Sequence, residues 1–508
     1  MNRRIFCKNV GATALAAAST RLPSQPVTAT LTVHDAPQRH VPGSFTGLSY
    51  ELAQLTEPSF FSPDHSGLVA LFRSLSPAGV LRVGGNTSEF CWIQLDSSTP
   101  APTLRVPPGN LAQNWMPHRL FPIPPLAIDN LAGFLRATGW KAIFGLNLGN
   151  SSPVRAAGEA ALVAAHLGES LAYFQIGNEP DFYRDANNGT RPPGWGFEEY
   201  LREWLAMADA ISTRFPNARF GGPDTGASSD WVTRFGNEIA PRLGNRLVAL
   251  SGHYYAEGPP NDPRVTIDRL LAGDPKVASS THDIVRVADA HRLRYRMTEG
   301  NSCYRGGKPG MSDAFAASLW AADYLLLLAS LGCAGVNLHG GDSRFLSAGL
   351  GDHNPGLEVT TGKRTSAPNG FYTPISSERG QPVSARPVFY GMLLAQQFAG
   401  ATMRACDLHS TAAVTAYAAL KDTRYLIAAI NKDKIPIALS IHADRTVRKA
   451  GLRRLTAPSL DATSGITFGS NAVSDAGLWA PTAEQLPVPT GAVQLVLPPA
   501  SAALLFLD

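Results

Sequence analysis

Short apolar runs recur between residues 45 and 402, and they alternate with stretches in which apolar residues lie three or four positions apart. A continuous run of apolar residues is typical of a buried strand. Apolar residues spaced three or four positions apart are typical of an amphipathic helix. Eight alternations of strand and helix predict a (β/α)8 TIM barrel, an α/β fold around a closed parallel sheet. The expected strands are 45–50, 80–85, 141–148, 171–179, 218–224, 247–255, 293–299 and 334–339.

The barrel expected over 45–402 exceeds the ~250 residues typical of this fold, so its connections must carry insertions. Three stretches, 59–73, 96–122 and 340–380, are rich in Pro, Gly or Ser, and we expect the insertions there. Helices are expected at 125–138, 197–212, 281–290, 312–331 and 387–400.

The pattern changes after residue 402, where short strand-like runs are joined by turns. Runs of this kind predict a C-terminal β-sandwich domain over 403–508. An earlier segment, 27–40, begins with alternating apolar and Thr residues and precedes the barrel. We expect it to supply an N-terminal strand to the sandwich. The expected C-terminal strands are 412–420, 425–431, 435–442, 452–457, 493–497 and 502–507.

Composition narrows the classes of function. The chain has 508 residues, of which 44% are hydrophobic and 17% charged, as in a globular enzyme. The net charge of +4 is small, and the chain has no sustained basic stripe with interleaved aromatic residues, so we expect no nucleic-acid partner. No apolar run reaches the ~18–20 residues of a membrane span. The scattered cysteines form no zinc motif, and we expect neither a metal nor another cofactor. The oligomeric state stays open.

Residues 1–22 resemble a twin-arginine export signal. Arg3 and Arg4 are followed by Phe6, Lys8 and a weakly apolar, alanine-rich stretch. The expected location is therefore periplasmic or extracellular. The alternative is a frayed N-terminus of a cytosolic protein.

Two carboxyl groups stand at the ends of predicted barrel strands. Asn178 and Glu179 precede Pro180, where a central strand must stop, and Glu299 ends the seventh strand before Gly300. Strand ends of a barrel carry the chemistry, and the fourth and seventh strands face each other across its mouth. Two facing carboxyls match glycoside hydrolysis, in which one acts as acid and the other attacks or activates water. The alternative is that each is an ordinary polar loop residue.

The motifs QIGNEPD at 175–181, TEGNSCYRGG at 298–307 and SDAFAA at 312–317 resemble the heparanase and β-glucuronidase family of retaining glycoside hydrolases (family 79-like). The resemblance covers the barrel and extends to the sandwich. It implies that Glu179 is the acid/base and Glu299 the nucleophile. It also implies that Tyr304 and Gly306 hold the carboxylate of a uronic acid.

Other residues are candidates for binding the sugar. The amides of a Gly-rich turn at Gly306 and Gly307 can form an anion-binding concavity, and Asn178 is placed to bond the 2-hydroxyl. Three further positions are candidates for binding the sugar, and for their aromatic side chains the alternative is a packing role at the rim of the barrel. They are Asn86 after the second strand, either Tyr254 or Tyr255 at the end of the sixth, and Tyr372 on the long eighth connection.

The functional hypothesis is a retaining exo-β-glucuronidase that hydrolyses terminal β-linked glucuronic acid in glycans or glycosides. Exo-action is expected because long inserted loops can wall off a pocket. One alternative is a heparanase-like endo-β-glucuronidase with an open cleft. Another is a carbohydrate-binding barrel protein without turnover.

Overall fold

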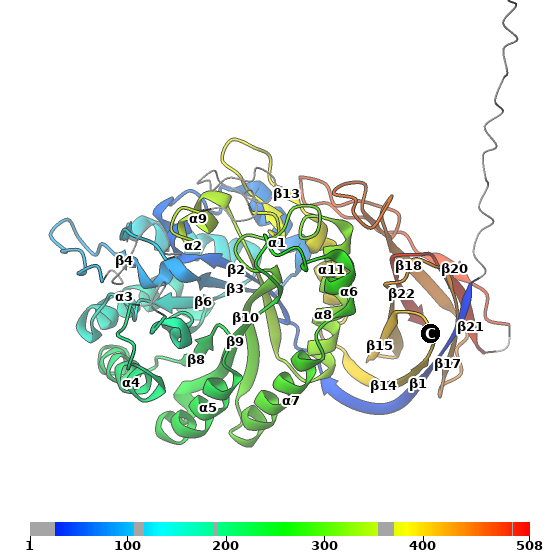
Figure 1. Cartoon of the computed structure of the whole chain (residues 1–508), viewed down its shortest axis with the longest axis horizontal. Coiled ribbons are helices and arrows are strands. Elements are labelled where there is room, and N and C mark those ends of the chain that lie inside the picture. The colour runs from blue at the N-terminus through cyan, green and yellow to red at the C-terminus, as the bar shows by residue number, and fades with distance from the viewer. Residues whose placement is uncertain (1–25, 106–115, 186–189, 354–369, 490) are drawn as a thin grey trace, which may run out of the picture.

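The computed structural model of the chain describes residues 26–105, 116–185, 190–353, 370–489 and 491–508. The expected export signal lies outside these ranges. Within them, eight parallel strands close into a barrel, with the helices outside it (Figure 1). The predicted fold class is thereby confirmed. The strands, in chain order, are β2 (Thr46–Glu51), β3 (Val80–Gly84), β6 (Lys141–Leu146), β7 (Leu171–Ile176), β8 (Phe220–Thr225), β9 (Leu247–Glu257), β10 (Arg294–Cys303) and β11 (Gly335–Gly340).

Long helices follow most of these strands. Two of them, α8 and α11, are buried on almost every side, as expected of helices that are apolar all round. The barrel covers one side of α8, and the C-terminal sheet contacts the other. The helices are α1 (Ser66–Leu75), α2 (Pro125–Thr138), α3 (Pro153–Leu167), α4 (Phe197–Arg214), α5 (Ser229–Leu243), α6 (Ile267–Ala272), α7 (Pro275–Ala290), α8 (Phe315–Ser330), α9 (Ser343–Ala348) and α11 (Pro387–Gln396).

The expected insertion at 59–73 is wrong in part, because α1 begins inside it at Ser66. Leu68, Leu71, Phe72 and Leu75 recur at helical spacing and are all buried. This amphipathic period outweighs the Pro and Ser residues nearby. The other two stretches hold short paired strands at their edges, β4 (Cys91–Ile93) with β5 (Phe121–Ile123) and β12 (Ile375–Ser376) with β13 (Ser384–Ala385).

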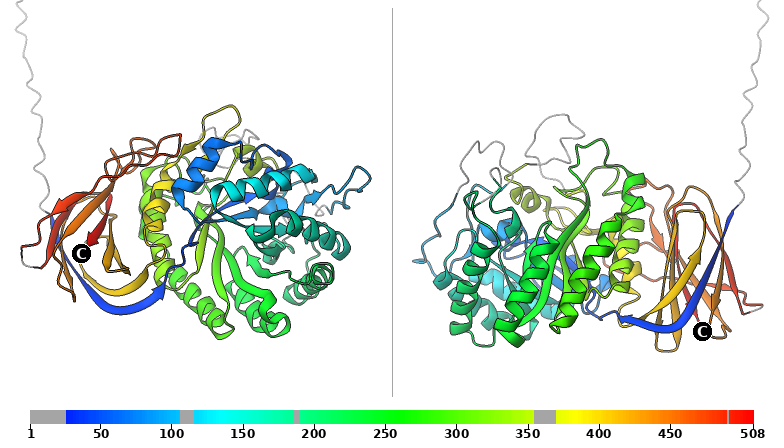
Figure 2. Two further views of the ribbon diagram at one scale, coloured as in Figure 1. Left: turned by 180° about the vertical axis from the view of Figure 1, so that it is seen from behind. Right: turned by 60° about the horizontal axis from the view of Figure 1, so that its bottom comes forward.

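The C-terminal domain is one mixed sheet that curls around its own apolar core, and not two separate sheets (Figure 2). Apolar residues from strands near both ends of the sheet share this core. Its ten strands in the described ranges are β1 (Val27–His40), β14 (Thr402–His409), β15 (Val414–Lys421), β16 (Arg424–Asn431), β17 (Ile437–Ala443), β18 (Ala450–Thr456), β19 (Thr467–Phe468), β20 (Glu484–Leu486), β21 (Val493–Leu497) and β22 (Ser501–Leu507).

Strand β1 is central to this sheet although it begins the described chain. It pairs antiparallel with β14 and parallel with β17, and in both views it runs from the barrel along β14 (Figures 1 and 2). The expected contribution of an N-terminal strand is therefore correct. No described helix has both the length and the apolar character needed to cross a bilayer.

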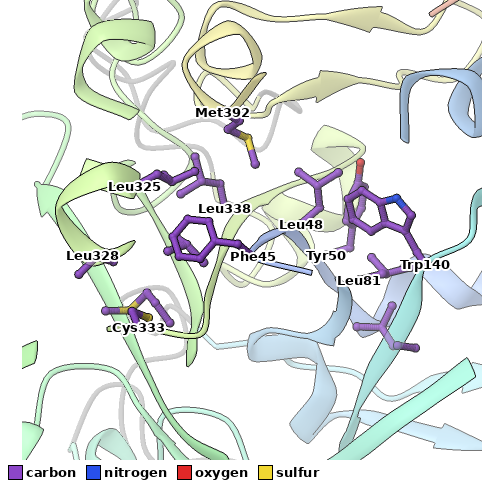
Figure 3. Close-up of a cluster of buried hydrophobic side chains, with 14 of the residues drawn as sticks. Phe45, Leu48, Tyr50, Leu81, Trp140, Leu325, Leu328, Cys333, Leu338 and Met392 are labelled. Atoms are coloured by element: carbon purple, nitrogen blue, oxygen red, sulfur yellow. The ribbon is translucent and has the colours of Figure 1, made fainter. Parts of the chain in front are cut away.

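The barrel is joined to its outer helices by a continuous apolar core. Figure 3 shows Leu338 of β11, and Phe45 just before β2, packed against Leu325 and Leu328 of α8 and Met392 of α11. This packing holds the strands rigidly and leaves their carboxyl ends to carry polar side chains.

Candidate active site

A cavity of about 720 Å³ opens at the carboxyl ends of the barrel strands. Both carboxyl groups singled out from the sequence line it, together with side chains from most of the other barrel strands and connections. Its volume is within the range of ligand pockets and exceeds that of a single sugar ring.

Glu179 is held by a tight turn after β7. Gly177 has a φ of +89° and Glu179 itself a φ of +50°, in the left-handed region that few non-glycine residues adopt. The Glu179 amide donates to the carbonyl of Asp224 at 2.9 Å, which fixes the turn to the end of β8. The carboxyl group of Glu179 thus points into the cavity and remains partly exposed, at 18%.

Glu299 lies within β10, and both of its oxygens have donors. Oε2 accepts from Arg82 Nη1 at 2.5 Å, and Oε1 accepts from the Tyr255 hydroxyl at 2.8 Å. His339 Nδ1 is 3.7 Å from Oε2. These contacts orient the carboxylate and stabilise its ionised form.

Glu179, Glu299 and His253 converge at one point. One side-chain oxygen of each carboxyl and one His253 nitrogen all lie within 4.8 Å of one another. Retaining glycosidases place their two carboxyls about 5–5.5 Å apart, and inverting enzymes separate them further to admit a water. The spacing therefore fits retention.

The two carboxyls have opposite electrostatic environments. Burial raises the pKa of Glu179, the negative charge of Glu299 raises it further, and the hydrogen bond from His253 opposes this rise. Burial would also raise the pKa of Glu299, but His339, His253 and Arg82 together bring it down to about 2. A protonated Glu179 beside an ionised Glu299 is the division of roles that double displacement needs.

His253 connects Glu179 to a buried carboxylate. Its Nδ1 is 3.0 Å from Glu179 Oε1, and its Nε2 is 3.2 Å from Asp224 Oδ1, an ion pair without hydrogen-bond alignment. Burial would lower the pKa of His253, yet Asp224 and Glu299 raise it to about 10. His253 is therefore an imidazolium at neutral pH.

The charge on His253 also bears on metal binding. Two carboxylates and a histidine have the donor types of a metal site. A metal-binding imidazole must be neutral, whereas Asp224 and Glu299 keep His253 protonated. The set of side chains suits proton transfer better than metal coordination.

Arg82 lies beneath the site and organises its floor. Besides Glu299, its guanidinium donates to Asn178 Oδ1 at 2.7 Å and to Asp224 Oδ2 at 2.5 Å. A side chain at Gly84 would collide with Arg82, so this glycine makes room for it. Arg82, Asp224 and Glu299 form a buried network in which the guanidinium and His253 balance the carboxylates.

Asn178 and Asn86 lie together on the opposite wall. The Asn178 amide donates to Asn86 Oδ1 at 3.1 Å, and Asn86 in turn donates to the carbonyl of Gly349 at 3.0 Å. Both asparagines line the cavity. The bond to Gly349 ties the second connection to the eighth on one side of the mouth, because β3 and β11 both flank β2.

Only one of the two tyrosines after His253 reaches the carboxylates. Side chains alternate along β9, so Tyr255 faces inward with His253 and bonds Glu299. Tyr254 faces outward and stacks on Tyr324 of α8, with ring centroids 5.3 Å apart. Tyr255 is therefore the one of the two alternatives that lies at the carboxylates, although Tyr254 also lines the cavity.

The candidates for uronate binding are also brought together. Tyr304 and Tyr372 line the cavity, and their rings flank Tyr255 with centroid distances of 6.5 and 6.1 Å. The carbonyl of Gly306 accepts from the Phe371 amide at 2.8 Å. Gly307 has a φ of +89°, and a Cβ there would lie 2.8 Å from the Tyr372 amide nitrogen.

Several side chains around the site were not recognised from the sequence. One feature of the sequence could have identified them: each is a polar residue at or near the carboxyl end of a barrel strand. Glu51 accepts from Thr87 and lies 3.5 Å from His339 Nε2. The residues missed are Glu51, Arg82, Asp224, His253 and His339.

Comparison with known proteins agrees with this geometry. No family model matches the chain. A β-glucuronidase of Aspergillus niger is 28% identical over 315 residues, which are 57% of this chain and 55% of the relative. A heparanase of Rattus norvegicus is 25% identical over 337 residues, 57% of this chain and 60% of the relative. The chain thus matches between one half and two thirds of the length of these relatives.

Solved structures share the fold. A 4-O-α-L-rhamnosyl-β-D-glucuronidase of Fusarium oxysporum superposes with a TM-score of 0.69 at 17% identity, covering 94% of this chain and 99% of the other. A family 51 α-L-arabinofuranosidase of Bifidobacterium longum gives 0.67 at 14% identity, covering 95% and 100%. These structures show a shared fold, and in sequence the chain is similar to β-glucuronidases and heparanases.

Proposed function

We propose that the chain is a retaining exo-β-glucuronidase that hydrolyses terminal β-linked glucuronic acid by double displacement. The observation that supports it most is the pair Glu179 and Glu299, whose oxygens approach within 4.8 Å at the mouth of the barrel. Their opposite pKa shifts match an acid and a nucleophile. The related β-glucuronidase sequences support the choice of sugar.

In the first step, a carboxylate oxygen of Glu299 attacks the anomeric carbon while the bond from that carbon to the leaving oxygen breaks. Glu179 gives its proton to that oxygen, and the aglycone departs as an alcohol. The sugar is then held as an ester of Glu299. Asn178, fixed by Arg82 and Asn86, is placed to bond the 2-hydroxyl.

In the second step, Glu179 is a carboxylate and takes a proton from water. The water oxygen attacks the anomeric carbon, the ester bond breaks, and Glu299 leaves as a carboxylate. Two inversions at the same carbon release β-glucuronic acid with its configuration retained. The imidazolium of His253 beside Glu179 favours the ionised form that this step needs.

Recognition of the uronic acid is assigned to the turn after β10. The Tyr304 hydroxyl and the amides of Gly306 and Gly307 offer donors to a carboxylate. Tyr372 joins them because the Gly306 carbonyl holds the neighbouring residue Phe371. Asn301 also donates to the carbonyl of Tyr372, at 2.9 Å, so the eighth connection is fixed against this turn.

Exo-action is favoured because the eighth connection closes the cavity on the side of Asn86 and Tyr372. The hydrogen bond from Asn86 to Gly349 joins the loops that follow β3 and β11 on one side of the mouth, and Leu346, Leu350 and Tyr372 of the eighth connection line the cavity. A polymer that continued past the glucuronate would have to displace these residues. An endo-acting enzyme would instead shorten heparan-type chains without releasing free glucuronate.

Four 4-nitrophenyl glycosides test the substrate: the β-glucuronide, β-glucoside, β-galacturonide and α-glucuronide. We expect turnover of the first alone, with β-glucuronic acid as the first product by proton NMR. Release of the α-anomer first would contradict retention. Tight glucuronate binding without release of nitrophenol would indicate a carbohydrate-binding barrel without turnover.

Two variants test the mechanism. Glu299→Ala should abolish hydrolysis, because no other group can form the ester. Glu179→Ala should retain part of its activity on the 4-nitrophenyl glycoside, whose leaving group needs little protonation, but lose roughly 10²- to 10⁴-fold on methyl β-glucuronide. Glu198→Ala, an exposed carboxylate on α4, is the control. Wild-type activity in Glu299→Ala would overturn the mechanism.

Export is a further part of the proposal, and it rests on the pair Arg3 and Arg4 before an apolar stretch. Replacing both with Lys should keep the protein inside the cell if this signal directs it. Cell fractionation measures the outcome.

A further inference from the structure

An exposed aromatic ring stands beside Glu179. Phe182 is 41% exposed and lines the cavity. Among the large exposed apolar side chains in the described ranges, it is the only aromatic one and the only one that lines this cavity. Single exposed apolar residues are common on protein surfaces, so its location at the catalytic mouth is what distinguishes it.

The turn that carries Phe182 is rigid. The Phe182 amide donates to the Glu179 carbonyl at 2.9 Å, and the Asp185 amide donates to the Phe182 carbonyl at 2.9 Å. Asp181 accepts from the amides of Gly226, Ala227 and Ser228 at 2.8–3.0 Å, which fixes the turn against the loop after β8. The backbone that carries the ring is therefore fixed before any ligand arrives.

Phe182 and the Glu179 carboxyl share one narrow space. A Cβ on Gly226 would collide with the Phe182 ring and lie 3.0 Å from Cδ of Glu179. The proton of a general acid must be next to the oxygen that leaves. The group attached to that oxygen therefore passes close to the Phe182 ring.

The charge of the cavity argues against a sulfated polymer as that group. Five carboxyl groups line it, at Glu51, Glu179, Asp185, Asp274 and Glu299, against the cationic side chains of Lys276 and Arg305 and the imidazolium of His253. The ammonium of Lys308 is bonded to the carbonyls of Asp262 and Val265. Glu179 is protonated when substrate binds, so the other four carboxyl groups face these three cations, and sulfate groups would meet no excess of positive charge.

We propose that Phe182 is the stacking platform of an aglycone site, and that the preferred leaving group is an uncharged aromatic ring system. This inference depends on the proposed glucuronidase activity. A flat ring on Phe182 would cover its exposed face and place the glycosidic oxygen near Glu179. Offset or edge-to-face aromatic contacts add to the free energy of area burial.

The test compares two substrates of the full-length protein. In 4-methylumbelliferyl β-glucuronide the leaving group has two fused rings, and in β-glucuronyl fluoride it has none. Phe182→Ala should lower kcat/KM for the first by roughly tenfold and change the second less than twofold. Phe182→Leu, which keeps apolar volume without a flat face, should also lose activity on the aryl substrate. Phe182→Trp should retain it.

Leu478→Ala, which changes an exposed residue of the C-terminal domain at 72% exposure, is the matched control. An equal loss on both substrates would mean that Phe182 acts on the sugar they share and not on the leaving group, and no loss on the aryl substrate would also overturn the inference. Preferential turnover of heparan-type polymer by the wild-type protein would overturn it as well. If the wild-type protein cleaves neither glucuronide, the proposed function itself is wrong.

Discussion

At the scale of single residues, His253 links both halves of the proposed chemistry. It is fully buried, contacts Glu179 and Asp224, and lies within 4.8 Å of an oxygen of Glu299. Its positive charge lowers the pKa of both Glu179 and Glu299. One imidazolium therefore sets the pH range in which the pair can work.

Replacing His253 with Asn should move the whole pH profile of kcat/KM upward. Glu299 acts when ionised, so activity falls as the pH drops through its pKa. Glu179 acts when protonated, so activity falls as the pH rises through its pKa. Because His253 lowers both pKa values, its loss raises both. Measurement of kcat/KM against pH with an aryl glucuronide checks this.

His166→Asn provides the control, since His166 is a partly exposed histidine on α3 that is hydrogen-bonded to Asp129, away from the cavity. Its profile should match that of the wild-type protein. A His253→Asn profile that stays in place or moves downward would contradict the role assigned to the imidazolium.

At the scale of the element, strand β9 sorts three consecutive residues onto two faces. His253 and Tyr255 point into the barrel mouth, and Tyr254 points to α8. The period of two along a strand is the physical reason. A shift of one residue in the register of β9 would put Tyr254 at Glu299 and remove both inward contacts.

Tyr255→Phe should lower kcat/KM for an aryl glucuronide by about 10- to 100-fold. The variant removes the hydroxyl that donates to Glu299 at 2.8 Å, and a hydrogen bond to a charged group contributes about 1.5–3 kcal/mol. The neighbouring variant Tyr254→Phe should leave the rate unchanged. Steady-state kinetics measure kcat/KM for both variants. Equal losses in kcat/KM would contradict the conclusion that Tyr255 faces the carboxylates and Tyr254 does not.

At the scale of the whole molecule, the barrel and the C-terminal sheet share a polar contact on α8. Asp323 accepts from Thr415 and Tyr417 of β15, each at 2.7 Å, and pairs with Lys432 at 2.8 Å. The carboxylate is 19% exposed and the lysine 11%. Removing one partner from interactions screened from water in this way costs more stability than breaking a surface ion pair.

Asp323→Ala should reduce the free energy of unfolding by roughly 1.5–3 kcal/mol, because it leaves the buried donors without a charged acceptor. Denaturant unfolding measures this loss. The control is Asp289→Ala, which breaks a surface pair with Arg39 of β1 in which both side chains are about half exposed. That variant should cost at most ~1 kcal/mol, and an equal cost for the two variants would contradict the assigned interface.

Much of the fold was predictable because its signals are local. The barrel strands are short segments between helical patterns, and each of the eight was placed within a few residues of its observed position. Helix α1 was missed because Pro and Ser near it resemble a loop. The single curled sheet was not predicted either, since β1 pairs with β14 and β17 more than 350 residues away, and pairing at that distance leaves no mark in a local pattern.

The sequence by itself determined the alternation of strands and helices and the location of Glu179 just after the fourth strand and of Glu299 on the seventh, because hydrophobic period and the stop at Pro180 are properties of neighbouring residues. Only the tertiary structure decided which side chains meet these carboxyls. Arg82, Asp224, His253 and His339 come from separate strands, and barrel closure and register bring them together. Their charges act through space, so the opposite pKa shifts of Glu179 and Glu299 arise only in the folded chain.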